Sequence, residues 1–273
     1  MHILIIGAHP DDCDVTCGGV SALWQAQGHH VKFVSVSNGD RGHFSPEYAK
    51  DRDLLAARRD WEARHAVAVI GADYECLNIH DGEIYVTPEL TEALVRLIRR
   101  WGPEGQGPDL VITNRPSDYH RDHRYTAQAV LDTSYVLTVP LMCPEVRHLD
   151  RMPVFAYWHD NFREGGAFRP DVAVPIDAVL ETKIEIVARH VSQFFEWLPY
   201  NAGTLDQVPQ DAEGRRALIR RYLEGRGERA TAACRAHDPQ LVPEDVSLTE
   251  AFQISEYGRQ PGPGELFKLF PVG

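Results

Sequence analysis

The stretch ILIIGAHPDD, residues 3–12, decides the fold of this chain and supplies its first candidate site. Four branched aliphatic residues open it and predict a short strand buried on both faces, as in a parallel sheet. Pro10 has no backbone donor and ends the strand, so His9, Asp11 and Asp12 lie on a tight loop beyond it. One imidazole and two carboxylates are costly to hold there without a compensating cation, which is the first argument for a metal ion.

The rest of the chain alternates between strand and helix patterns in its first half. Such alternation predicts an α/β fold: a Rossmann-like, doubly wound, mostly parallel sheet with helices on both faces. Strands are predicted over residues 31–37, 74–79, 109–113, 154–158 and 172–176, and helices over 20–27, 46–70, 90–98, 120–131, 177–195 and 211–235. We expect a single domain over residues 1–273, with a core at 1–197 and a C-terminal helical extension and tail at 198–273. The apolar tail needs a partner surface, on its own protomer or on a neighbour.

Composition narrows the classes of function. The chain has 273 residues and a formal net charge of −12, which disfavours nucleic-acid binding because that requires a basic surface. Its five cysteines are scattered and show no metal-type spacing, and its first apolar run is too short for a signal peptide or a membrane span. We therefore expect a cytoplasmic protein without a membrane span that acts on a small molecule, and a homo-oligomer is compatible with this sequence.

A second polar motif follows the strand predicted at residues 109–113. The stretch NRPSDYHRDH, residues 114–123, places His120 and His123 three positions apart, so both can face the same side of a helix. In a doubly wound sheet the first strand tends to be central, and the next unit begins on its other side. The loop carrying His9 and the loop carrying His123 are therefore expected to face each other across the switch point.

Together these residues fit a catalytic metal site. His9, Asp12 and His123 can supply three ligands and leave positions open, a set that suits Zn²⁺ and also Fe²⁺ or another divalent ion. Asp11 is the candidate general base, and His120 the candidate group that protonates a leaving amine or polarises a carbonyl oxygen. Asp122 is expected to orient His120 by accepting its second N–H.

The two motifs, with CGG at 17–19, NGDRG at 38–42, Asp81-Gly82 and a K-x6-H-x-S-Q pattern at 183–193, resemble the LmbE-like (PIG-L) family of metal-dependent de-N-acetylases. The resemblance implies a hydrolase in which metal-bound water attacks the acetamide of an N-acetylated amino sugar, such as an N-acetylglucosamine conjugate, releasing acetate and a free amine. By residue, it implies zinc ligands at His9, Asp12 and His123, a base at Asp11, an acid or oxyanion stabiliser at His120 with Asp122 behind it, and sugar contacts at Arg41 and Asp81.

The sequence departs from the family at two places. Cys13 stands where many members have Glu. Cys13 and Cys17 lie near the site, and we expect buried fillers there, although a thiolate is a strong zinc ligand. The segment Tyr157–Gly166 does not match the best-known members and is expected to build the substrate pocket, with His159 an ordinary surface residue, a substrate contact or a late metal ligand.

Other classes of function remain open. One is a non-catalytic sugar- or nucleotide-binding α/β module, which would not need Asp11. Another keeps the metal ion and cleaves a different amide or an ester. An NAD-dependent oxidoreductase is disfavoured because the first strand–helix turn lacks the G-x-G-x-x-G pattern.

Overall fold

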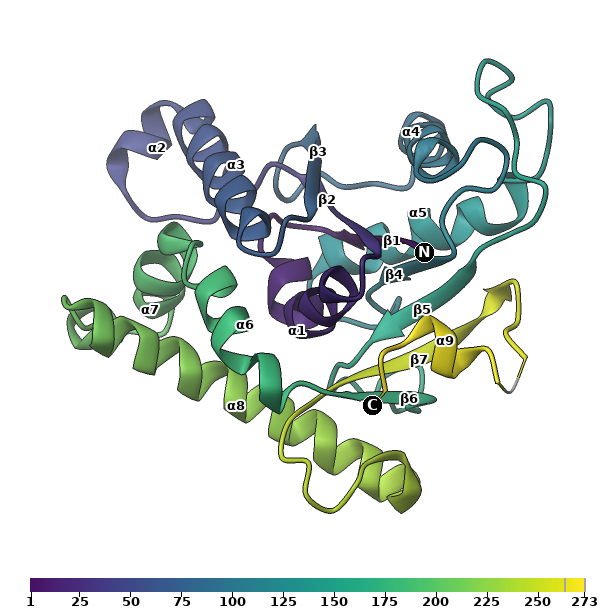
Figure 1. The fold of residues 1–273 in the computed structure, drawn as a ribbon. Helices are drawn as coiled ribbons and strands as arrows, with labels where there is room; N and C mark the ends of the chain where they lie inside the picture. The colour runs from purple at the N-terminus through teal and green to yellow at the C-terminus, as the bar shows by residue number, and fades with distance from the viewer. Residues whose placement is uncertain (263, 273) are drawn as a thin grey trace.

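A seven-stranded sheet forms the centre of the protein (Figure 1), whose computed structural model describes residues 1–262 and 264–272. The strand order is β3-β2-β1-β4-β5-β7-β6. The first five strands in sequence pair in parallel, and β7 runs antiparallel to both β5 and β6. The strands are β1 (His2–Gly7), β2 (His30–Ser37), β3 (Asp73–Ile79), β4 (Leu110–Thr113), β5 (Val154–Trp158), β6 (Val172–Pro175) and β7 (Thr249–Gly258). The predicted α/β class with a mostly parallel sheet is confirmed.

Helices connect the strands and continue after β6. The α-helices are α1 (Asp12–Ala26), α2 (Pro46–Lys50), α3 (Arg52–Ala68), α4 (Pro88–Arg100), α5 (Arg121–Val136), α6 (Leu180–Val187), α7 (Leu198–Asn201), α8 (Ala212–His237) and α9 (Leu266–Leu269). A π-helix, η2 (Ser192–Trp197), precedes α7, and short 3₁₀ turns are η1 (Asp177–Val179), η3 (Leu205–Gln207) and η4 (Pro239–Leu241). None of the helices in the described residues is both long and apolar enough to cross a membrane.

Successive side chains of β1 point to opposite faces of the sheet, so each face has its own core. Ile3 and Ile5 pack with residues of α1 and with Phe270 near the C-terminus. Leu4 and Ile6 pack with residues of α4 and α5 on the other face. Because all four are fully buried, β1 lies between two layers of helices, as the aliphatic run predicts.

The position of β1 in the sheet determines where the two polar motifs meet. β1 pairs in parallel with β2 on one side and with β4 on the other, and Ile5 aligns with Ile112. The carboxyl ends of β1 and β4 therefore lie side by side at one edge of the sheet, which is where open α/β folds place ligands.

The sequence-based expectations were wrong or incomplete in four places. The first helix, predicted over 20–27, begins at Asp12. The strand β7 was not predicted, although it pairs between β5 and β6 and completes the sheet. The helix predicted over 46–70 is interrupted at Asp51, whose side chain accepts from the Asp53 N–H and caps α3. The helix predicted over 177–195 is likewise divided into η1, α6 and the start of η2.

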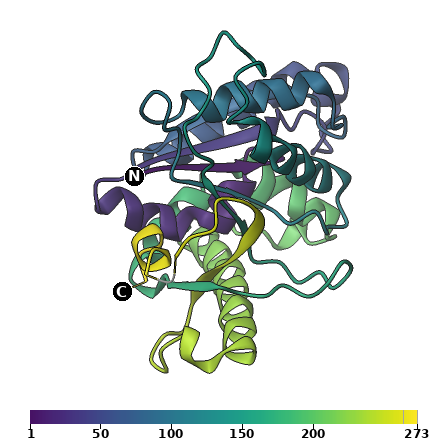
Figure 2. The same ribbon diagram turned by 90° about the vertical axis from the view of Figure 1, so that its right-hand side faces the viewer.

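The C-terminal tail finds its partner surface on its own chain. Figure 2 shows the tail, in yellow, beside the purple helix α1. The Trp24 indole N–H donates to the Leu269 carbonyl at 2.9 Å, and the rings of Trp24 and Phe252 both pack against Phe270. Of the two alternatives for the tail, packing on the same protomer is the one observed.

Candidate active site

The first loop of the site is held in place by Asp12, the first residue of α1. Its Oδ2 accepts the backbone N–H groups of Ala8 at 2.9 Å and His9 at 2.8 Å. Gly7 is required beside it, since a Cβ at that position would lie 2.7 Å from the Asp12 Cβ. These contacts fold the chain back at the end of β1 and turn the His9 side chain toward the β4 side of the edge.

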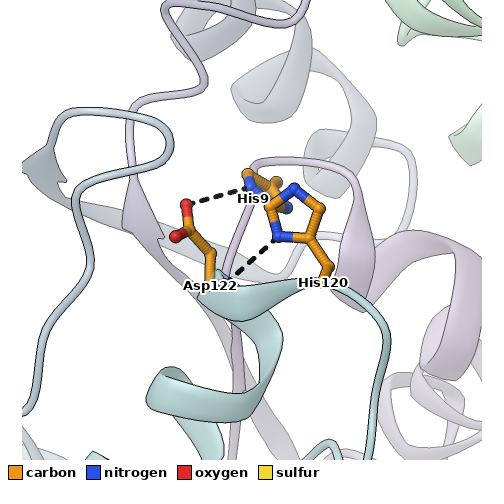
Figure 3. Close-up of side chains that lie close together, drawn as sticks. All are labelled: His9, His120 and Asp122. Carbon is orange, nitrogen blue, oxygen red and sulfur yellow. Dashed lines mark hydrogen bonds and ion pairs between the residues drawn. The ribbon is translucent and has the colours of Figure 1, made fainter.

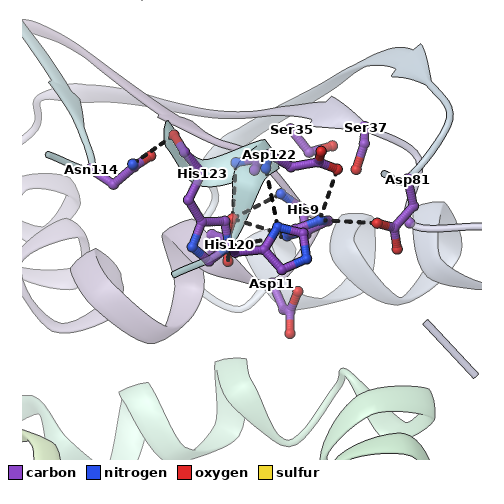
Figure 4. A network of polar contacts seen from close by, with 12 residues as sticks. His9, Asp11, Ser35, Ser37, Asp81, Asn114, His120, Asp122 and His123 are labelled. Atoms are coloured by element: carbon purple, nitrogen blue, oxygen red, sulfur yellow. Dashed lines mark hydrogen bonds and ion pairs between the residues drawn. The ribbon is translucent and has the colours of Figure 1, made fainter. Parts of the chain in front are cut away.

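The second loop is held by the start of α5. His120 is the N-cap of that helix, and its Nδ1 accepts the Asp122 N–H at 3.2 Å. The Asn114 side-chain amide donates to the His123 carbonyl at 2.8 Å, which ties the end of β4 to the first turn of α5. Figure 4 shows the histidines of the two loops gathered into one network.

The two loops bring three candidate metal ligands within coordination distance of one another. His9 Nδ1 lies 3.2 Å from His123 Nε2, and the Asp12 carboxylate lies 3.6 Å from each of these nitrogens. Ligands bound at about 2.1 Å around a tetrahedral ion are separated by about 3.4 Å. The spacing of His9, Asp12 and His123 therefore fits one divalent ion.

The other nitrogen of each imidazole is already paired with a carboxylate. His123 Nδ1 lies 2.9 Å from Asp118 Oδ2, while His9 Nε2 lies 3.3 Å from Asp81 Oδ1. When both rings are neutral and each shares its proton with a carboxylate, the nitrogens that face each other are two lone pairs, an arrangement that a cation stabilises. Asp118 was not singled out from the sequence, although it lies only five residues before His123.

The electrostatics of the cluster also favour a positive ion. Burial lowers the pKa of His9, but the carboxylates of Asp12, Asp122 and Asp81 outweigh burial and raise that pKa well above its ordinary value. Burial raises the pKa of Asp81, but His9 and Arg59 lower it by more, so that the pKa falls to about 2. The site therefore stabilises a cation among ionised carboxylates.

Ligand-capable atoms also meet in an overlapping group made of His9, His120 and Asp122 (Figure 3). In this group His120 Nδ1 already accepts the Asp122 N–H, and Asp122 Oδ2 accepts the Gly82 N–H. These atoms are engaged within the protein. By contrast, among the described residues no carboxylate oxygen lies closer than 3.6 Å to the facing nitrogens of His9 and His123.

The prediction that the Asp122 carboxylate contacts the His120 ring was wrong. Asp122 holds His120 through its main-chain N–H, and its buried carboxylate faces Gly82 and, at 3.6 Å, His9 Nε2. The reason is the N-cap geometry of α5, which turns the ring of residue 120 onto the backbone of residue 122. Burial, His9 and His123 lower the pKa of His120, so its ring is neutral with the proton on Nε2.

Asp11 is oriented by a residue that the sequence did not reveal. Arg59 of α3 donates from Nη2 to Asp11 Oδ1 at 2.8 Å and from Nη1 to the Gly39 carbonyl at 3.1 Å. Its side chain is only 3% exposed. In the sequence Arg59 is one of many charges along the predicted helix 46–70, and no local pattern distinguishes it.

Arg41 and Asp81, the two sugar contacts that the family resemblance implies, have different surroundings. Arg41 lines the cavity described below and is paired with Glu83. Asp81 also lines the cavity, but its carboxylate contacts His9 and thus supports a candidate ligand.

The side chains of the motif at residues 183–193 contact the elements that surround the site. Lys183 pairs with Glu250 at 2.6 Å, and His190 lies 3.3 Å from Asp14 inside the core. Ser192 donates to Glu62 at 2.6 Å, and Gln193 donates to the Gly42 carbonyl at 3.1 Å.

The nearby cysteines have no role in the cluster. Cys13 and Cys17 are buried in the core, and burial raises the pKa of both thiols well above its ordinary value. Neither belongs to a ligand group found in the described residues, which agrees with the expectation of buried fillers.

A cavity of about 780 Å³ opens over the cluster. His9, Asp11, His120 and His123 lie in its wall, together with residues 158–162 and one face of α8. The expectation that the segment Tyr157–Gly166 builds the pocket is therefore borne out for residues 158–162. Arg115 fixes this segment through two hydrogen bonds to Asp160, at 2.7 and 2.6 Å.

The fold and the cluster together define an α/β protein with a candidate metal centre at the carboxyl edge of its parallel strands. Residues 4–134 match the family model PIG-L, described as GlcNAc-PI de-N-acetylase. This matched stretch contains both the motif at residues 9–12 and the motif at residues 120–123, by which the chain resembles the LmbE-like proteins.

Individual relatives bear different names. The chain is 26% identical to diacetylchitobiose deacetylase from Thermococcus kodakarensis, over 72% of this chain and 74% of that protein. It is 25% identical to 4-oxalmesaconate hydratase from Pseudomonas putida, over 76% of this chain and 80% of that protein. Among solved structures, N,N'-diacetylchitobiose deacetylase from Pyrococcus horikoshii shares the fold with a TM-score of 0.70 and 21% identity, covering 93% of this chain and 83% of that one.

Proposed function

We propose that this protein is a metal-dependent deacetylase that removes the acetyl group from an N-acetylated amino sugar or its conjugate. The observation that carries the proposal is the pair of imidazole nitrogens, His9 Nδ1 and His123 Nε2, facing each other at 3.2 Å beside two carboxylates. The relatives named as deacetylases of N-acetylated sugars support the same reaction.

His9, Asp12 and His123 would hold the ion. Two nitrogens and one carboxylate oxygen favour Zn²⁺, and the same donors accept Fe²⁺. When bound, such an ion polarises a carbonyl oxygen and lowers the pKa of a coordinated water toward about 7.

Asp11 is proposed as the general base. Arg59 engages its Oδ1, which fixes the carboxylate and leaves Oδ2 free to accept a proton from the attacking water in the cavity. Because Asp11 precedes the ligand Asp12 on the same loop, the base and the candidate ion site keep a constant relative position.

His120 is proposed as the group on the other side of the scissile bond. Its Nδ1 accepts the Asp122 N–H, so Nε2 carries the proton and can donate a hydrogen bond to the carbonyl oxygen as negative charge develops there; the departing amine then takes the proton that Asp11 has removed from water. In this scheme Asp122 positions His120 through its backbone, and its carboxylate helps to hold His9.

Arg41 and Asp81 are proposed to face the sugar, because both line the same cavity as Asp11 and His120. Of the two, Arg41 is the better candidate for direct contact, since the Asp81 carboxylate is shared with His9.

The test combines metal analysis with an amine-release screen over N-acetylglucosamine conjugates, using Asp11→Asn as the control. We expect about one divalent ion per chain, acetate and amine in equal amounts, and a loss of at least about 100-fold in kcat for the folded variant. A folded, metal-loaded protein that releases no amine from any conjugate would contradict the proposal. Binding of a sugar that is equally strong with and without Asp11, and without turnover, would instead favour the non-catalytic module.

One relative favours a second candidate reaction. The hydratase from Pseudomonas putida matches 76% of this chain, so the same scaffold is associated with the addition of water to a carbon–carbon double bond. Consumption of an unsaturated acid without acetate release would identify that activity, and hydrolysis of another amide or ester would be found in the same screen.

A further inference from the structure

The cavity contains two arginines that have no acidic partner. It is lined by four arginines and one lysine. Arg41 pairs with Glu83, Arg59 with Asp11 and Lys183 with Glu250. The other two, Arg226 and Arg229, make no ion pair within 4 Å anywhere in residues 1–262 and 264–272.

The acidic groups of the cavity are all engaged elsewhere. Asp118 pairs with His123, Asp160 with Arg115, and Asp81 with His9. Asp12 is held by two backbone N–H groups and Glu250 by Lys183. The α8 wall therefore carries two guanidinium groups that form no ion pair with these carboxylates, although the chain as a whole has a net charge of −12.

Helix α8 is seated closely enough for these side chains to belong to the wall. A Cβ on Gly227 would lie 3.1 Å from Leu248, so the helix backbone is close to the segment leading into β7. The Thr231 and Thr249 hydroxyls meet at 3.1 Å, and Ala230 is buried. Because Arg226 and Arg229 are three positions apart on this helix, they project from the same side of it.

His159 lines the same cavity and is close enough to both guanidinium groups to feel their charge. Burial lowers the pKa of His159 to about 4, and the charges of Arg226 and Arg229 lower it in the same direction. The ring is thus neutral and can donate or accept a hydrogen bond beside the two cations. Arg226 also lies over the Tyr222 ring, 5.9 Å from its centroid.

We propose that Arg226 and Arg229 form a subsite for an anionic group, a carboxylate or a phosphate, carried by the substrate away from its reacting acyl-amine end. Guanidinium groups suit both anions because they offer several planar donors. The inference rests on the proposed function for the identity of the reacting end, and it restricts the substrate class to acidic conjugates.

The experiment compares neutral and anionic forms of one sugar, in binding and in turnover. The probes are the methyl glycoside of N-acetylglucosamine, its carboxymethyl glycoside, and N-acetylglucosamine 1-phosphate and 6-phosphate. Binding is measured by calorimetry on Asp11→Asn, which separates recognition from chemistry, and kcat/KM is measured on the protein with Asp11 intact. The test variant is R226Q/R229Q, and the control is R216Q/R220Q, which removes the same charge from the part of α8 paired with Glu181.

We expect at least one anionic probe to bind about 10- to 100-fold more tightly than the methyl glycoside, in keeping with one or two charge-assisted hydrogen bonds. R226Q/R229Q should abolish that preference and leave the neutral probe unaffected, while R216Q/R220Q keeps it. Comparing the affinities of the carboxylate probe and the phosphate probes identifies which anion the subsite prefers.

Two further outcomes distinguish failure of the subsite from failure of the deacetylase activity. Equal binding of all probes, or a preference that survives R226Q/R229Q, overturns the subsite even if acetate is released. A preference that depends on Arg226 and Arg229 without any amine release supports the subsite and contradicts only the deacetylase activity.

Discussion

The Arg59 guanidinium donates to the Asp11 carboxylate at 2.8 Å from a side chain that is only 3% exposed. This pair joins α3 to the loop after β1, two elements separated by nearly fifty positions in the sequence. It fixes one oxygen of the Asp11 carboxylate and also ties Asp11 to the Gly39 turn.

Arg59→Gln is expected to lower kcat by about 10- to 100-fold with a smaller change in KM, because a misplaced base affects the transition state more than binding. Steady-state kinetics on an amine-releasing substrate would measure the changes in kcat and KM separately. The control is Arg58→Gln, since Arg58 pairs with Glu196 and Glu62 and has no contact with Asp11. Equal losses in both variants would mean that Arg59 acts only on stability.

Asp118→Asn is expected to weaken metal binding by about 10- to 100-fold, because the carboxylate that holds His123 Nδ1 at 2.9 Å would be lost. Competition with a fluorescent chelator would measure the affinity. Asp150→Asn removes an exposed carboxylate that pairs with Arg147 and should bind metal normally. Unchanged affinity in Asp118→Asn would exclude this support for His123.

Removal of metal by a chelator is expected to abolish activity and lower the melting temperature, and zinc should restore both. An ion that binds only the folded state stabilises it by about 2.7 kcal/mol at 100 times its dissociation constant. Asp12→Asn should lose most of the zinc-dependent shift in melting temperature, whereas Asp11→Asn should keep it. A full shift in Asp12→Asn would remove Asp12 from the ligand set.

The stability of the protein is expected to depend on His159 between about pH 6.5 and pH 4. The folded-state pKa of about 4 lies below the ordinary value of 6.5. The unfolded chain therefore binds more protons in this window, and the free energy of unfolding falls as the pH decreases, by at most about 3 kcal/mol.

Urea unfolding at pH 8 and pH 5 would test this dependence. His159→Asn should lose less stability between the two pH values than the natural protein does. His237→Asn, at the exposed end of α8, should behave like the natural protein. If His159→Asn were as acid-sensitive as the natural protein, another group would be responsible.

Local patterns determined much of the fold and of the ligand cluster. Residues 3–12 specify a buried strand that ends in polar side chains, and residues 114–123 repeat that arrangement after a second strand. Parallel pairing places both ends at one edge, so proximity of His9 and His123 follows from the fold class.

Contacts between distant elements were decided only by the tertiary structure. Arg59, Arg226 and Arg229 lie among other charges on polar helices, and only packing shows that one contacts Asp11 and two face the cavity. Strand β7 was likewise recognised only from its position in the sheet, between β5 and β6. Hydrophobic periodicity reports which face of an element is buried, but it carries no information about which distant side chain lies opposite that face.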